Sequence, residues 1–216
     1  MVSVSHGSAF KAPTFNDMFF PFTDFGSGFT FEGNPDLQPE SSTTTELLVK
    51  AAFDAISGYV SLYRTEVEDL IASTATTVEN IAEADISGAD LGVEFVVGGV
   101  LTQLGLAYVD AENAKSGERL PRRARTTATL DLSKRIAAID WSLAWQAQGN
   151  RIDGAGVLAG YNLVDARASY QINEELQIGA AVKNIFGTDY TLVSSGFQQF
   201  RTEGQTASVY IAYQPR

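Results

Sequence analysis

The amino-acid sequence predicts an all-β fold, an antiparallel up-and-down transmembrane β-barrel of about ten strands, forming a single domain over residues 1–216. Three observations predict it. Apolar residues recur at every second position, which is the period of a strand. The connections between these segments alternate between short and long. One side of each segment is almost uncharged through its middle, whereas the other side carries small polar residues.

The alternation divides the chain into ten expected strands and leaves no helical stretch. They cover residues 2–10, 43–53, 59–71, a segment ending at 97, 101–111, 124–134, 139–146, 161–172, 176–186 and 205–213. Gly98 and Gly99 predict a two-residue hairpin turn, because glycine readily adopts the positive φ that such turns require.

The lengths of the connections predict two different ends for the sheet. Short connections are expected at 54–58, 98–100, 135–138 and 173–175, and long ones at 11–40, 73–79, 112–123, 149–160 and 187–200. Alternate connections of an up-and-down sheet lie at the same end, so one end of the sheet has short turns and the other has long loops. Outer-membrane barrels have short periplasmic turns and long extracellular loops.

The two faces of the strands favour a barrel in lipid over a soluble β-sandwich, which also alternates. The polar side of a sandwich faces bulk water, whereas the polar side here is mostly small and carries few charges, as suits a confined lumen. These charges are Glu46, Asp90, Glu94, Asp131, Asp140 and Asp165 against Lys50, Arg167 and Lys183. The residues expected to face lipid are Leu47, Val49, Leu91, Val93, Leu104, Leu130, Trp141, Leu143, Ile178, Val209 and Ile211.

Composition argues against several other classes of protein. A net charge of −11 argues against nucleic-acid binding. Cysteine is absent and histidine occurs once, so a disulfide framework and a thiolate metal site are excluded and histidine-based catalysis is limited. No apolar run approaches the roughly 18 residues of a membrane helix. The first ten residues lack the features of a signal peptide.

The stretch Gly33–Ser42, GNPDLQPESS, is predicted to be a rigid segment that leads from a long loop into a strand. Its two prolines fix φ and forbid a regular element. It resembles a signature of the TonB-dependent outer-membrane receptors. Further segments resemble the same family in the same order. They are AFKAP at 9–13, EVEDLI at 66–71, ISGADLGVEF at 86–95, LPRRAR at 120–125, GYNLVDARASYQI at 160–172 and VKNIFGTDY at 182–190.

The resemblance covers essentially the whole chain and is nearest to the cobalamin and siderophore transporters. It implies the outer membrane of a Gram-negative bacterium, membrane lipid as a partner, and in the parent protein an N-terminal plug domain and TonB. The chain resembles only the last ten strands of a 22-stranded barrel, without the plug domain or the coupling box. Pro215 stands where the family carries a terminal aromatic residue. We therefore expect a fragment or a truncated gene product.

No residue pattern indicates a catalytic site, and we expect no enzyme and no cofactor. His6 and Ser5 are neighbours in an expected strand, so they point to opposite faces. Two acidic groups, Glu66-Glu68-Asp69 and Asp24/Glu32/Asp36, lack the ligand spacing that calcium requires, and we expect no metal site.

Two loop features remain open as binding sites. The loop at 11–40 holds seven phenylalanines between Phe15 and Phe31, which either pack on one another or contact a bulky ligand. The candidate ligand contacts are Phe19, Phe20, Phe22, Phe25 and Phe29. Arg122, Arg123 and Arg125 form a basic cluster that either meets lipid phosphates or offsets acids such as Glu118.

Three functions follow as hypotheses. The first is the barrel portion of an energy-coupled importer of a metal chelate such as a siderophore or cobalamin, which is not expected to transport alone. The second is a passive pore or a surface-binding barrel, and the third is a soluble β-sandwich binding module. Because an open sheet edge is costly in hydrocarbon, residues 2–10 are expected to pair with residues 205–213 and close a ten-stranded barrel. The alternative is an arc of a larger wall.

Overall fold

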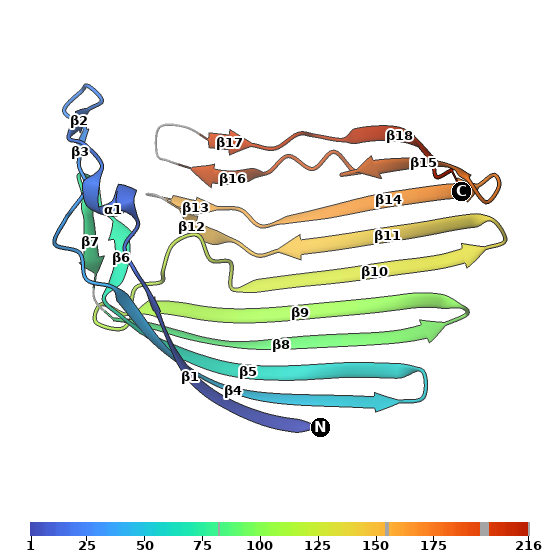
Figure 1. Ribbon diagram of the computed structural model, residues 1–216, viewed down its shortest axis with the longest axis horizontal. Helices are drawn as coiled ribbons and strands as arrows, with labels where there is room; N and C mark the ends of the chain where they lie inside the picture. The colour runs from blue at the N-terminus through green and yellow to red at the C-terminus, as the bar shows by residue number, and fades with distance from the viewer. Residues whose placement is uncertain (82, 154–155, 195–198, 216) are drawn as a thin grey trace.

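The computed structural model describes residues 1–216 except 82, 154–155, 195–198 and 216. The described residues form one ten-stranded antiparallel sheet, four two-stranded hairpins and one short helix. The ten long strands lie side by side as a curved wall, and the hairpins gather at one end of it (Figure 1). This arrangement confirms the predicted all-β antiparallel fold.

Each expected strand is present in the sheet, in up-and-down order. The strands are β1 (Val2–Lys11), β4 (Glu40–Phe53), β5 (Ile56–Glu68), β8 (Ala84–Val97), β9 (Val100–Asn113), β10 (Thr126–Ile136), β11 (Ile139–Gln148), β14 (Tyr161–Gln171), β15 (Leu176–Lys183) and β18 (Thr206–Tyr213). Each strand pairs with the long strands that precede and follow it in the chain, so the strands alternate in direction across the sheet.

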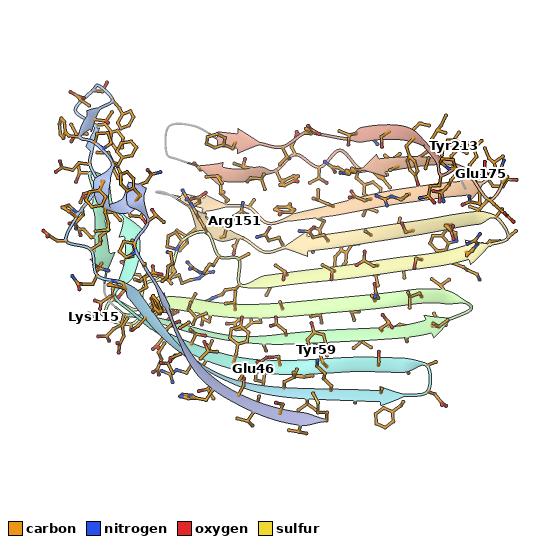
Figure 2. All side chains as sticks on the ribbon, in the orientation of Figure 1. Glu46, Tyr59, Lys115, Arg151, Glu175 and Tyr213 are labelled. Atoms are coloured by element: carbon orange, nitrogen blue, oxygen red, sulfur yellow. The ribbon has the colours of Figure 1, made fainter. Side chains whose placement is uncertain are left out.

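The turn end of the sheet has tight connections. Gly98 and Gly99 both have positive φ, 59° and 75°, as the predicted hairpin turn between β8 and β9 requires. Asp54 and Ala137 adopt the same left-handed region at two other turns. At the fourth turn, the side-chain oxygen of Asn173 accepts hydrogen bonds from the backbone amides of Glu175 and Leu176. Figure 2 shows Glu175 and Tyr213 at this end of the sheet.

The loop end carries more structure than the sequence predicts. It holds α1 (Phe15–Phe19) and the hairpins β2–β3 (Thr23–Asp24, Thr30–Phe31), β6–β7 (Leu70–Ser73, Val78–Ile81), β12–β13 (Arg151–Asp153, Gly156–Leu158) and β16–β17 (Thr191–Ser194, Gln199–Arg201). Parts of the expected loops 149–160 and 187–200 lie outside the described residues.

Two expectations about this end are wrong. A helix does form, because Thr14 and Asp17 make a capping box around the first turn of α1. The hydrogen bonds from the Thr14 hydroxyl and then from the Thr14 amide lower the pKa of Asp17. The strand expected over 59–71 is interrupted at Asp69, whose positive φ of 56° separates β5 from β6. No helix in the described part of the chain is long and apolar enough to span a membrane.

The register sorts the side chains of the sheet into two faces, because directly opposed residues on neighbouring strands point the same way. One unbroken row runs Val49, Val60, Leu91, Leu106, Ala128 and Ala147. All eleven residues predicted to face lipid lie on this face, which we call the apolar face. The nine charged residues expected in the lumen lie on the opposite face, which we call the polar face. Contact of the apolar face with lipid is a prediction from this division of the residues.

Tyrosines of the polar face lie over glycines of the neighbouring strand. Tyr59 opposes Gly92, and a Cβ added at Gly92 would collide with the Tyr59 ring. The same relation holds for Tyr63 over Gly88 and for Tyr210 over Gly179. Each ring therefore covers the backbone of the adjacent strand at a position where only glycine leaves room. Tyr59 is labelled in Figure 2.

The small buried core lies at the loop end of the sheet, against the polar face. Ala84, Ala111 and Leu120 are buried together, and Val67 and Ile86 pack against them on the polar face. Leu120 comes from the connection between β9 and β10, and its amide donates to the carbonyl of Ala111. This connection therefore folds inward over the polar face.

The sheet does not close. β1 and β18 form its two edges, and no pairing joins them among the described residues; Figure 1 shows them at opposite margins of the wall. The expected pairing of residues 2–10 with 205–213 is therefore wrong, and the structure is an open arc. A ten-stranded closure leaves an interior that side chains nearly fill. The tyrosines over glycine and the six acids of the polar face would crowd such an interior.

The two faces predict opposite responses to the same substitution. Leu130→Arg places a charge on the apolar face beside Leu104 and Trp145. In a bilayer this change should lower the free energy of unfolding by about 2–4 kcal/mol. Thr129→Arg, one residue earlier on the polar face, should cost far less because Thr129 borders an open groove of about 720 Å³. Refolding titrations into lipid vesicles measure both, and equal costs would mean that the faces are wrongly assigned.

Candidate functional site

The exposed aromatic surface of the first long loop is the leading candidate for ligand contact. Phe22 and Phe25 are 65% and 59% exposed, and Phe19 and Phe29 are also exposed. Phe25 and Phe29 pack on each other with ring centroids 5.6 Å apart. Phe20 is half-buried and packs against Phe31 edge to face, with ring centroids 5.6 Å apart. The loop thus both packs on itself and presents apolar rings to solvent.

The Gly33–Pro39 segment holds this loop against the β6–β7 hairpin. The side-chain amide of Asn34 donates to the carbonyl of Val78 at 3.0 Å. Asn80 accepts from the Gln38 amide at 2.8 Å and donates to the carbonyls of Gln38 and Asp69 at 2.9 and 2.7 Å. These side chains satisfy backbone groups that two prolines and irregular geometry leave without strand partners. The first two long loops are therefore one rigid unit, at the left of Figure 1.

A buried carboxylate joins the remaining long loops. The side chain of Asp153 in β12 is only 1% exposed. It accepts a hydrogen bond from Nε of Arg122 at 2.9 Å and another from the Ser194 amide at 2.8 Å. Burial by itself raises the pKa of Asp153, but the Ser194 and Arg122 hydrogen bonds and the charges of Arg122 and Arg151 outweigh it, so the pKa lies below its ordinary value of 3.8. We call this group the Asp153 anchor.

Arg151 strengthens the same contact from the other end of β12. It is buried, and its Nη2 atom donates to the carbonyls of Thr191 and Leu192 in β16. Its Nη1 atom is buried and has no hydrogen-bond partner. Figure 2 shows Arg151 where the β12–β13 hairpin leaves the sheet. Beside it Tyr161 stacks on Tyr190 at 4.2 Å.

The basic cluster of the sequence is largely neutralised by acids. Arg122 pairs with Asp153, as described. Arg125 donates to Asp110 at 2.7 Å and to Glu112 at 3.3 Å, and the hydrogen bond to Asp110 is the main cause that raises the pKa of Arg125. Arg123 is exposed and donates to the carbonyl of Pro121. Two of the three arginines, Arg122 and Arg125, therefore form ion pairs with nearby acids. These acids are Asp153, Asp110 and Glu112, and not Glu118.

The candidate residues for catalysis and metal binding do not come together into a site. His6 Nδ1 lies 2.9 Å from the Thr45 hydroxyl on the apolar face, whereas Ser5 donates to Glu46 on the polar face. Glu66 pairs with Arg64, and Glu68 accepts from Ser41. Within the described ranges, no group of three or more histidine, cysteine, aspartate or glutamate side chains is arranged to hold a metal ion.

The polar face contains a groove near the turn end, with a volume of about 720 Å³. Its lining includes Tyr59, Gly92 and Gly105, and also the charged residues Lys50 and Glu94. Gln103 donates to Glu94 at 2.8 Å. The groove is open and carries charge of both signs, so it is suited to contact a polar protein surface.

Comparison with known proteins identifies the family. Residues 1–185 match the family described as TonB dependent receptor-like, beta-barrel. The vitamin B12 transporter BtuB of Vibrio vulnificus is 30% identical over 217 residues, which cover 97% of this chain and 34% of that protein. BtuB of Photobacterium profundum is 29% identical and covers 96% of this chain and 35% of that protein. The chain thus spans about a third of the length of the curated relatives it matches.

A solved structure shows the same fold. The copper transporter OprC superposes with a TM-score of 0.81 at 21% identity, covering 98% of this chain and 36% of that one. The homologues are transporters and receptors and not enzymes. The curved ten-stranded wall, its elaborated loop end and the ordered sequence match lead to one conclusion: the chain belongs to the TonB-dependent receptor β-barrel family, whose members are outer-membrane proteins of Gram-negative bacteria.

Proposed function

We propose that the chain is part of the barrel wall of an energy-coupled outer-membrane importer, and that its ligand is a metal chelate of the cobalamin class. One observation carries the proposal: the match to vitamin B12 transporters runs through 97% of the chain at 30% identity. The solved structures are less than 25% identical to the chain, so they support the fold and leave the ligand open.

The arrangement of the loops supports this function. Four hairpins and α1 gather at the end that faces the cell exterior in such barrels. The exposed rings of Phe19, Phe22, Phe25 and Phe29 offer apolar surface to a bulky, partly apolar ligand, and the half-buried Phe20 packs on Phe31 in the same loop. Binding residues in proteins concentrate on loops that a rigid scaffold holds in place.

The two open edges and the polar face point to partners for the chain. An unpaired strand edge in hydrocarbon costs several kcal/mol for each unsatisfied group, so β1 and β18 need strands from a larger barrel of the 22-stranded kind. The groove on the polar face suits a plug domain in the lumen, which TonB would move from the periplasm. We infer that the 216 residues of the chain form one domain, the arc, and that the arc does not transport by itself.

Uptake of labelled cobalamin tests the proposal. Cells that lack their own cobalamin receptor should accumulate it when they express the gene containing this chain, and should lose uptake when TonB is deleted. Expression of residues 1–216 alone should give no TonB-dependent uptake. Accumulation that persists without TonB would instead indicate a passive pore. Uptake of a ferric siderophore in place of cobalamin would show that the ligand is a different metal chelate, while the protein would still be an energy-coupled importer.

The aromatic surface predicts a binding defect without a stability defect. Replacing Phe22 and Phe25 by serine should weaken cobalamin binding to whole cells roughly tenfold, because truncation of aromatic anchors typically costs more than 1 kcal/mol. Phe186→Ser is the matched control, since Phe186 is 77% exposed but lies outside the cluster. Equal affinity in the double variant and the control would show that the rings only pack on one another.

The Asp153 anchor predicts pH-dependent protection of the outer loops. Because its pKa is lower in the folded protein, the anchor stabilises fully above the ordinary value of 3.8 and is lost as the pH falls through the lowered value. Asp153→Asn should remove this dependence and cost about 1.5–3 kcal/mol, the range for hydrogen bonds to charged groups. Hydrogen exchange at the Ser194 amide measures it, with Asp36→Asn as an exposed control. Identical exchange in Asp153→Asn and the native chain would refute the anchor.

A further inference from the structure

Neighbouring long strands of the wall are joined by two kinds of connection, which differ in what they do to the register. A tight turn fixes which residues of its two strands stand opposite each other. Such turns join β4 to β5, β8 to β9, β10 to β11 and β14 to β15. The remaining pairs are joined through the loop end; β5 ends at Glu68, for example, and β8 begins only at Ala84. The register of these pairs therefore needs another cause.

The alternation of side chains does not exclude a shift of β8 along β5 by two residues. A shift by one residue would exchange the two faces, whereas a shift by two keeps them. On the apolar face, such a shift again places aliphatic residues opposite one another. Val60 opposes Leu91, and after the shift it would oppose Ala89 or Val93. The apolar face therefore discriminates poorly between these registers.

The tyrosines that cover glycines lie at strand pairs that no tight turn joins. The pairs are Tyr59 over Gly92 and Tyr63 over Gly88, between β5 and β8, and Tyr210 over Gly179, between β15 and β18. Among the glycines that the structure describes, these three are the ones whose added Cβ would collide with a tyrosine ring. Both strand pairs are connected through the loop end.

The native register of β5 and β8 is the one that places both rings over glycine. Tyr59 and Tyr63 are four positions apart, as are Gly88 and Gly92. A shift by two residues, in either direction, would bring Asp90 under one of the rings. A ring over that carboxylate would take water from a charged group, which is costly. A shift by four residues would leave only one ring over glycine.

We propose that the three tyrosine–glycine pairs set the register of the strand pairs that no tight turn fixes. During folding, β8 can meet β5 in several alignments that keep the faces of the sheet. Cross-strand aromatic contacts stabilise the native alignment alone, and aromatic residues over glycine pin the register of β-sheets in general. The proposal concerns side chains of the polar face, and it is independent of which ligand the protein carries.

Disulfide formation between introduced cysteines reads the register directly. The 216 residues contain no cysteine, so an introduced pair is the only one in the arc. A disulfide needs Cβ atoms about 3.5–4.5 Å apart, which opposed residues approach, whereas diagonal neighbours lie roughly 7–8 Å apart. Leu62→Cys with Ala89→Cys reports the native register. Leu62→Cys with Ser87→Cys, or with Leu91→Cys, reports a shift by two residues in one direction or the other.

The gene containing this chain is expressed in the outer membrane, and the purified protein is oxidised and analysed by mass spectrometry of linked peptides. Native tyrosines should give the native disulfide and almost none of the shifted ones. In Tyr59→Ala/Tyr63→Ala the shifted disulfides should rise about tenfold, because two cross-strand aromatic contacts are lost. Tyr59→Phe/Tyr63→Phe keeps both rings and should behave as the native protein does. Tyr63→Ala alone serves if the double alanine variant does not insert.

Leu91→Cys with Leu106→Cys is the internal control, because the turn at Gly98 and Gly99 fixes β8 against β9. This disulfide should form equally in every variant. The proposal would be overturned by an unchanged register in a folded alanine variant. Shifted disulfides in the phenylalanine variant would also overturn it, because the rings are still present there. Loss of the control disulfide together with the native one would mean a general loosening of the sheet and would likewise refute it.

Discussion

The structure depends on satisfying the backbone hydrogen bonds of its strands. Each of the eight inner strands of the arc donates to and accepts from two neighbours, so their amides and carbonyls need no water. This requirement explains why the wall is one continuous sheet and why its side chains are free to differ so sharply between faces. It also makes the two edge strands the only long strands of the described chain with an unmatched side.

The sequence predicts the sheet well because the strand period and the turn residues are local signals. The alternation from Leu91 to Val97 locates β8, and Gly98-Gly99 fixes the turn that follows it. Closure is a different matter, because a two-residue period carries no information on the curvature of the sheet. The ring of Tyr59 over Gly92 is one of the groups that would crowd a closed ten-stranded interior, and that relation joins residues 33 positions apart that only a register can match.

At the loop end, too, local features are predictable from the sequence and non-local ones are not. The capping box of Thr14 and Asp17 is a readable local pattern, so α1 is predictable in principle, although the surrounding prolines and glycines indicate only a loop. The Asp153 anchor has no such signal. Its partners Arg122 and Ser194 lie 31 and 41 residues away, and neither neighbourhood is unusual in composition. The exposed phenylalanines are visible in the sequence, but their division into supporting and exposed rings needs the fold.

The up-and-down order of the strands has a consequence for how the wall forms. Every pairing in the large sheet joins long strands that follow one another along the chain, although many paired residues are far apart in sequence, such as Val2 and Val49. Each such pairing closes a loop, and the entropic cost of closure rises only slowly with the length of the loop. The arc can therefore grow by adding one hairpin at a time, each new strand templated by the last. In the proposed larger barrel, pairing of the outer sides of β1 and β18 would be a separate step, because no strand of the arc supplies their partners.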